Sequence, residues 1–67
     1  MEKELSKESV KTMLNHWIEH NESHSRSFRD RASQVQAISE QAAQDIKEAA
    51  DLMDKCTEML KKAMKDL

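Results

Sequence analysis

Neither glycine nor proline occurs among the 67 residues of this sequence, so the two residues that most often mark turns are missing. The second half is rich in alanine, glutamate, lysine, glutamine, leucine and methionine, all of which favour helix. β-Branched residues are few, and they never alternate with polar residues in the pattern of a strand. The sequence therefore predicts an all-α fold.

The length of the chain predicts a single helical domain over residues 1–67. Domains of this size bury little apolar surface and are commonly stabilised by disulfide bonds, metal ions or a partner. Cys56 is the only cysteine, so no disulfide bond can form within the chain. Self-association or a bound metal is left as the expected source of extra stability.

Charge and hydropathy exclude several classes of partner. The formal net charge is -2 with both signs interspersed, whereas binding to nucleic acid needs a basic surface. No apolar run approaches the roughly 20 residues of a membrane span, and residues 1–5 lack the apolar stretch of a signal peptide. We therefore expect a soluble cytoplasmic protein that contacts neither nucleic acid nor membrane.

The first half of the chain has the apolar periodicity of a helix. The residues on its predicted buried face are Val10, Leu14, Trp17, Asn21, His24, Phe28, Ala32 and Val35, widened by Met13 and Ile18. Ser6 is the predicted N-cap, and Leu5 with Val10 is the predicted hydrophobic staple. Trp17 is expected to anchor the core, and Asn21 needs a polar partner if it is buried.

The second half carries the alternating three- and four-residue spacing of a coiled-coil seam. The predicted seam consists of Ala42, Ile46, Ala49, Met53, Cys56, Leu60, Ala63 and Leu67. Leu52 and Met59 widen the apolar sector on one side, and Ala50 and Met64 widen it on the other. One partner helix does not cover so broad a sector, which favours a bundle of three or four helices.

A turn is predicted just before Ser39, which serves as N-cap of the second helix with Ile38 and Ala43 as its staple. This division gives helices at about residues 7–37 and 40–66. They are expected to form an antiparallel two-helix hairpin that dimerises into a four-helix bundle.

The register of this hairpin places Phe28 against Ala49, Val35 against Ala42 and His20 against Cys56. The alternative architecture is one continuous helix in a long coiled coil, because the heptad phase runs from Leu14 to Leu67 without interruption. In that coiled coil Asn21, Ser25 and Ser39 would occupy seam positions, where polar residues weaken a dimer. The hairpin is therefore the favoured prediction.

Three histidines form the one cluster that points to a chemistry. His16, His20 and His24 each lie one helical turn from the next, and imidazoles at i and i+4 can bind one metal ion. Steps of four residues drift by about 40° round a helix, so His24 is expected inside the apolar sector, His20 at its edge and His16 mostly outside. The predicted metal ligands are His20 and His24, completed by His16 or Cys56, and they suit zinc, nickel or cobalt.

Two other interpretations of the histidines stay open. In one, His24 is a hydrogen-bonded core residue and His16 lies on the surface; in the other, histidine protonation drives a switch. Residues 16–20 also match H-x-x-E-H, the inverted zinc-peptidase motif. Those enzymes need a further ligand from a distant segment and a substrate cleft, which 67 helical residues do not provide. We therefore expect no enzymatic activity and no catalytic residues.

Residues 16–24, His-Trp-Ile-Glu-His-Asn-Glu-Ser-His, are followed by Phe28, Ala32 and an alanine-, leucine- and glutamate-rich second half. This arrangement resembles a small uncharacterised prokaryotic helical-hairpin domain with an H-W-x-x-H-N-x-x-H start, over about residues 12–67. The resemblance implies a hairpin and a link with metal handling. Members of that family have a glycine-containing turn near residues 38–40, where this chain has Ala37-Ile38-Ser39.

Two functional hypotheses follow. The first is a small metal-binding helical protein that uses the histidine cluster. The second is a structural or adaptor module that binds itself or a larger protein through its apolar face, with the histidines incidental.

Overall fold

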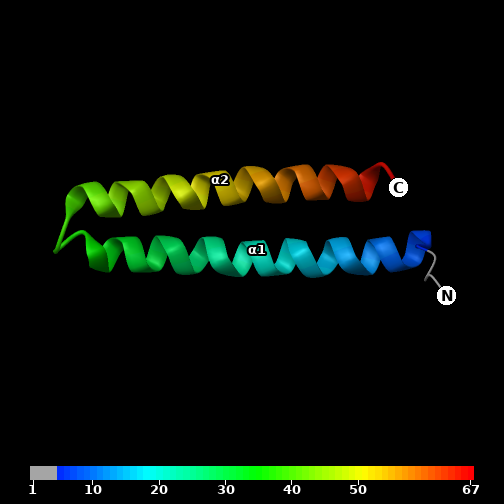
Figure 1. The fold of residues 1–67 in the computed structure, drawn as a ribbon, viewed down its shortest axis with the longest axis horizontal. Helices are drawn as coiled ribbons and strands as arrows, with labels where there is room; N and C mark the ends of the chain where they lie inside the picture. The colour runs from blue at the N-terminus through cyan, green and yellow to red at the C-terminus, as the bar shows by residue number, and fades with distance from the viewer. Residues whose placement is uncertain (1–4) are drawn as a thin grey trace.

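The computed structural model describes residues 5–67. Helix α1 (Lys7–Val35) and helix α2 (Glu40–Lys65) run side by side in opposite directions, so the start of α1 lies beside the end of α2 (Figure 1). The predicted all-α antiparallel hairpin is confirmed, and a single continuous helix is excluded. Across the described residues, neither helix is apolar enough over a sufficient length to cross a membrane.

Both helices begin at the predicted serine caps. The Ser6 side chain accepts a hydrogen bond from the Ser9 backbone N–H at 3.1 Å, and the Ser9 hydroxyl accepts one from the Ser6 N–H at 3.0 Å. The Ser39 side chain accepts a hydrogen bond from the Ala42 N–H at 3.1 Å. The predicted hydrophobic staples are wrong, because Leu5 is 73% exposed and Ile38 is 87% exposed.

The turn between the helices needs no glycine. Within residues 5–67 no backbone φ is positive, so no residue occupies the left-handed region that glycine favours. The Val35 carbonyl accepts hydrogen bonds from the N–H groups of Ile38 at 2.8 Å and Ser39 at 2.9 Å. Ser39 itself is extended, and its cap starts α2. The cap at Ser39 therefore allows the chain to turn without the glycine that the resemblance implies for family members near residues 38–40.

The interface between the helices is a seam of small buried residues alternating with larger, half-buried ones. The buried residues are Leu14, Ser25 and Ala32 of α1 and Ala43, Ala50 and Thr57 of α2. The half-buried seam residues are Ile18, Asn21, Phe28 and Val35 of α1 and Ile46, Met53, Leu60 and Met64 of α2. Small residues in the seam allow the two backbones to approach closely, which favours dense packing.

The predicted seam was partly in the wrong phase. Its members Leu14, Phe28, Ala32, Val35, Ile46, Met53 and Leu60 do lie in the seam, whereas Trp17, His24, Ala49, Cys56, Ala63 and Leu67 are exposed. Five of the displaced residues are replaced by their successors Ile18, Ser25, Ala50, Thr57 and Met64. Trp17 is 42% exposed and is not a core anchor.

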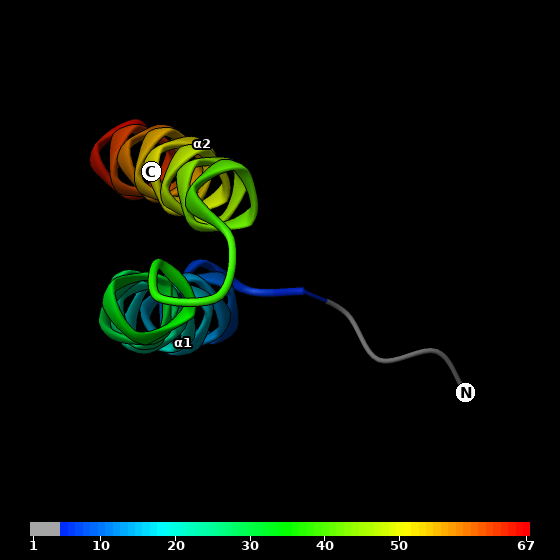
Figure 2. The ribbon, with the colours of Figure 1, turned by 90° about the vertical axis from the view of Figure 1, so that its left-hand side faces the viewer.

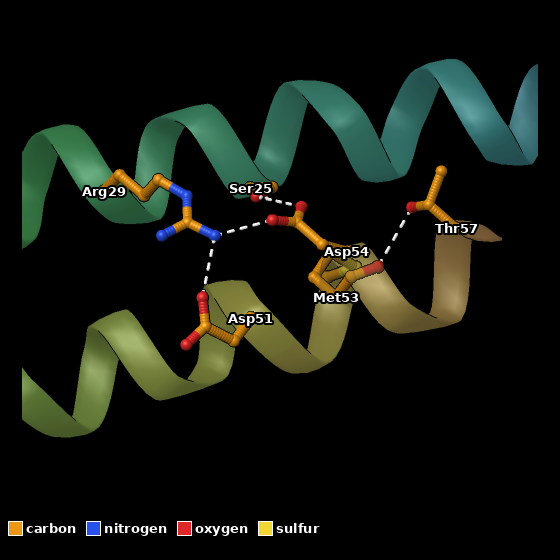
Figure 3. Close-up of polar contacts among 6 residues, drawn as sticks. All are labelled: Ser25, Arg29, Asp51, Met53, Asp54 and Thr57. Carbon is orange, nitrogen blue, oxygen red and sulfur yellow. Dashed lines mark hydrogen bonds and ion pairs between the residues drawn. The ribbon is translucent and has the colours of Figure 1, made fainter.

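Hydrogen bonding explains why polar residues are tolerated in the seam. The Ser25 hydroxyl donates to Asp54 Oδ1 at 2.6 Å, and the Thr57 hydroxyl donates to the Met53 carbonyl at 2.9 Å (Figure 3). A buried hydroxyl costs little when it has such a partner. Ser25 and Thr57, and not His24 and Cys56, face the opposing helix, and both hydroxyls have a hydrogen-bond partner.

The hairpin is a single layer of helices. The view along the molecule shows α1 and α2 stacked as one pair joined by the turn (Figure 2). In the part of the chain that the structure describes, no large side chain is fully buried. The core is therefore thin and open on both broad faces.

Candidate functional site

One side of the hairpin carries charged contacts between the helices. Arg29 Nη2 lies 2.9 Å from Asp51 Oδ1 and 2.6 Å from Asp54 Oδ2, and Figure 3 shows its guanidinium between the two carboxylates. Further along the same side, Lys61 Nζ lies 3.3 Å from Glu22 Oε2. We call these five residues, Glu22, Arg29, Asp51, Asp54 and Lys61, the polar side.

The contacts on the polar side shift two ionisation equilibria. Hydrogen bonds from Ser25 and then Arg29 lower the pKa of Asp54 below its ordinary value, because both donors favour the charged carboxylate. Hydrogen bonds to Asp51 and Asp54 raise the pKa of Arg29. The Arg29, Asp51 and Asp54 side chains are 45%, 68% and 51% exposed, so water screens these interactions and each adds little stability.

The opposite side of the hairpin is apolar and exposed. The polar side uses residues that follow a seam residue by one position, such as Glu22, Arg29, Asp54 and Lys61. Residues that precede a seam residue by one position therefore lie on the other side of the seam. We give the name apolar face to a set of apolar residues on this side, Trp17 of α1 and Ala49, Leu52, Cys56, Met59 and Ala63 of α2. The same side also carries His20, His24 and Arg31 of α1 and Asp45 of α2.

Exposure distinguishes the apolar face from the core. Leu52 is 67% exposed and Met59 is 65% exposed, so the hairpin covers only about a third of each residue. Asn21 Nδ2 lies 3.6 Å from Cys56 Sγ, which places Cys56 next to the seam although the residue is exposed. A contiguous apolar surface of this kind commonly marks an interaction site.

The three histidines form a ladder of rings along α1, beside the apolar face. Their ring centroids are 5.6 Å apart for His16 and His20 and 4.6 Å apart for His20 and His24. The ladder continues to Phe28, whose ring centroid lies 6.2 Å from that of His24. All three histidines are exposed, so the interpretation of His24 as a core residue is wrong.

The predicted metal ligands are only partly brought together. His20 and His24 are neighbouring rings, whereas the residue beside Cys56 is Asn21, so the predicted pairing of His20 with Cys56 is wrong by one position. Within residues 5–67, no group of three or more His, Cys, Asp or Glu side chains is placed to hold a metal ion. A metal site built from His20, His24 and either His16 or Cys56 stays a prediction.

The polar side is not recognisable as a unit from the predicted seam. The available signal was the opposite charge of Glu22 and Lys61, and of Arg29 and Asp54, each one position after a seam residue. The four charged residues fall on one side of the seam only when Ser25, and not His24, is assigned to the seam. The charge pattern can be recognised only after that assignment.

Comparison with known proteins gives a family without an assigned activity. A family model described as Domain of unknown function (DUF8180) matches residues 10–67. An uncharacterized protein of Archaeoglobus fulgidus is 35% identical over 57 residues, which span 85% of this chain and 92% of that protein. No solved structure matches the chain. These findings support the resemblance to a small uncharacterised domain, while its H-W-x-x-H start stays a prediction. Because the family model and the archaeal relative both extend over most of its length, the chain belongs to the DUF8180 family of domains of unknown function.

Proposed function

We propose that this protein is a structural interaction module whose hairpin binds a second copy of itself through the apolar face, and that it acts by binding and not by catalysis. The observation that carries the proposal is the exposure of Leu52 and Met59, at 67% and 65%, on a stripe of α2 whose other members, Ala49, Cys56 and Ala63, are apolar too. Burying a leucine side chain is worth about 1.5–3 kcal/mol, and the isolated hairpin forgoes most of that gain.

The dimensions of the hairpin support this proposal. A compact 67-residue domain has a radius of gyration of about 11 Å, whereas that of the hairpin is 15.8 Å. Its accessible surface is 5411 Å² for a mass of 7.8 kDa, against about 4400 Å² for a typical globular monomer of that mass. The excess is comparable to the roughly 800 Å² that each partner buries in a standard interface.

A second hairpin would supply the missing layer. Two helices cannot enclose a core on both broad faces, whereas two stacked hairpins form a four-helix bundle with a shared interior. The apolar face would then become part of that interior, and the polar side would stay in contact with water. This arrangement also accounts for the breadth of the apolar sector of α2.

The experiment is sedimentation equilibrium across the micromolar range, with one charge placed on the apolar face. Wild-type protein should sediment at twice the monomer mass of 7.8 kDa, and Leu52→Glu should sediment as a monomer because a carboxylate cannot be buried there unpaired. The matched control is Gln44→Glu, which adds the same charge to an exposed position of α2 outside the apolar face. A wild-type monomer at high micromolar concentration, or a Leu52→Glu dimer, would contradict the proposal.

A second candidate function is binding of a transition metal by His20 and His24. The observation in its favour is the 4.6 Å separation of their ring centroids, since neighbouring exposed rings can both reach one ion with metal–nitrogen bonds of about 2.0–2.1 Å. Two ligands from one chain leave positions for water or for side chains of a second copy. The metals that suit such a site are zinc, nickel and cobalt.

Calorimetric titration of tag-free protein with nickel or zinc tests this candidate. His20→Ala should abolish saturable binding, because His20 is the histidine that neighbours both others. The control His16→Ala should weaken binding less, since it leaves the closer pair of rings intact. Binding should also weaken on acidification, because protons compete for the imidazole nitrogens. Unchanged affinity in His20→Ala would leave self-association as the proposed function.

A further inference from the structure

We infer that the second copy docks in one orientation, with the two α2 helices antiparallel across a two-fold axis at Cys56. This inference rests on the proposed self-association and specifies its geometry. It assigns the centre of the interface to one residue of each copy, because a residue on a two-fold axis meets its own counterpart.

The sizes of the side chains on the apolar face are symmetric about Cys56. Ala49 lies two helical turns before Cys56 and Ala63 lies two turns after it, while Leu52 and Met59 lie about one turn to either side. When two such helices run antiparallel about Cys56, Ala49 meets the partner's Ala63 and Leu52 meets the partner's Met59. Small residues then oppose small ones at the ends, and long, adaptable side chains fill the space between them.

The net charge of α2 changes sign at the same point. In an antiparallel pair centred on Cys56, residues 47–55 lie over residues 57–65; the first segment carries three acidic side chains and two lysines, and the second carries three lysines and one glutamate. Such a pair places a segment of net charge -1 over one of net charge +2, whereas a parallel pair places each segment over its own copy. Complementary charge of this kind fixes orientation and suppresses the wrong one.

The face of α1 is less suited to be the centre of the interface. Beside Trp17 its exposed residues on this side include His20, His24 and Arg31, which are polar or charged and need hydrogen-bonding partners when buried. The stripe on α2 from Ala49 to Ala63 has no charged member. Pairing α2 with α2 therefore desolvates the fewest polar groups.

Disulfide trapping in the full-length chain tests the orientation. Oxidation by diamide, which takes up the two thiol hydrogens, should link wild-type protein through Cys56 of each copy, because a disulfide needs Cα atoms about 4.4–6.8 Å apart. Two further variants carry Cys56→Ser with either Ala49→Cys or Ala63→Cys, and one of them is labelled with ¹⁵N. Mixed together, they should form the 49–63 heterodimer on the order of tenfold or more faster than either homodimer, because only that pair is held in contact.

The outcomes separate this inference from the proposed function. Circular dichroism first establishes that each variant retains its helix, and sedimentation establishes whether it dimerises. A dimer that forms the 49–49 and 63–63 links in preference to the mixed link would overturn the antiparallel orientation while leaving self-association intact. A dimer with no link at any of the three positions would place the interface elsewhere. Absence of a dimer would overturn both statements.

Discussion

The two sides of the hairpin differ in what they leave exposed. The polar side joins α1 to α2 through Arg29, Asp51 and Asp54 and through Glu22 and Lys61. The apolar face has one polar contact across the seam, between Asn21 and Cys56, and leaves Leu52 and Met59 to solvent. The comparison indicates that the polar side sets the register between α1 and α2, whereas the apolar face is the surface that is free to bind a partner.

The polar side contributes specificity more than stability. Exposed ion pairs are worth little individually, but a wrong register would leave Arg29 away from both carboxylates and Ser25 without its acceptor. Register errors are a real risk here because the buried positions of the seam are mostly alanine, serine and threonine, which differ little in size. The bonds from Ser25 and Arg29 to Asp54 distinguish the observed register from one displaced by a turn.

The largest expected effect comes from the seam that joins the two sides. Ala32 is fully buried, so Ala32→Leu should force the helices apart and weaken contacts on both sides at once. Overpacking of this kind costs about 1–3 kcal/mol. Urea denaturation followed by circular dichroism, at one fixed protein concentration, should show the loss as a lower midpoint with little change in slope.

The control for this variant is Ala37→Leu, which makes the same change at an exposed residue of the turn. It should alter the midpoint by much less, because no seam contact is involved. Equal midpoints for the two variants would show that the helices are not closely packed at Ala32, and the division into two sides would lose its basis.

The helical architecture was predictable from the sequence, but the rotation of the helices was not. Serine caps at Ser6 and Ser39 and large seam residues such as Phe28 and Ile46 follow from capping chemistry and amphipathic spacing. Periodicity measures apolar character alone, so it assigned Ala49 to the seam and Ala50 to its flank, whereas Ala50 is fully buried.

The same limitation misplaced His24, which is exposed and not inside the apolar sector. The position of His24 depends on whether Ser25 occupies the seam, and that depends on a hydrogen bond to Asp54 from the other helix. No local pattern in α1 contains this partner. The spacing of the three histidines is visible in the sequence. Their exposure to solvent could be known only from how α1 packs against α2.

An intermediate effect is expected at Trp17, the only tryptophan in the chain. Its side chain belongs to the apolar face and is 42% exposed in the hairpin, so docking of a second copy should shield it. Acrylamide quenching of its fluorescence should therefore decrease as protein concentration rises through the dimerisation range. The same titration on Leu52→Glu should show no change, and a wild-type signal independent of concentration would remove Trp17 from the interface.

The smallest expected effect is a pH dependence from the polar side. Hydrogen bonds from Ser25 and Arg29 lower the pKa of Asp54 in the folded state below its ordinary value of 3.8. The unfolded chain therefore binds more protons than the folded chain between these two pKa values, and stability falls as pH decreases through that range. The stabilisation from Asp54 should be fully present above pH 4 and lost below it.

Melting temperatures measured from pH 6 to pH 2 for wild type and Asp54→Asn test this contribution. The variant should melt slightly lower at pH 6, and its melting temperature should fall less steeply on acidification, because it lacks the carboxylate that is protonated. Asp30→Asn is the control, since it removes one exposed carboxylate from outside the polar side and should follow the wild-type curve. If Asp54→Asn and Asp30→Asn gave the same curve, the contact of Ser25 and Arg29 with Asp54 would not persist in solution, and the polar side could not be what sets the register.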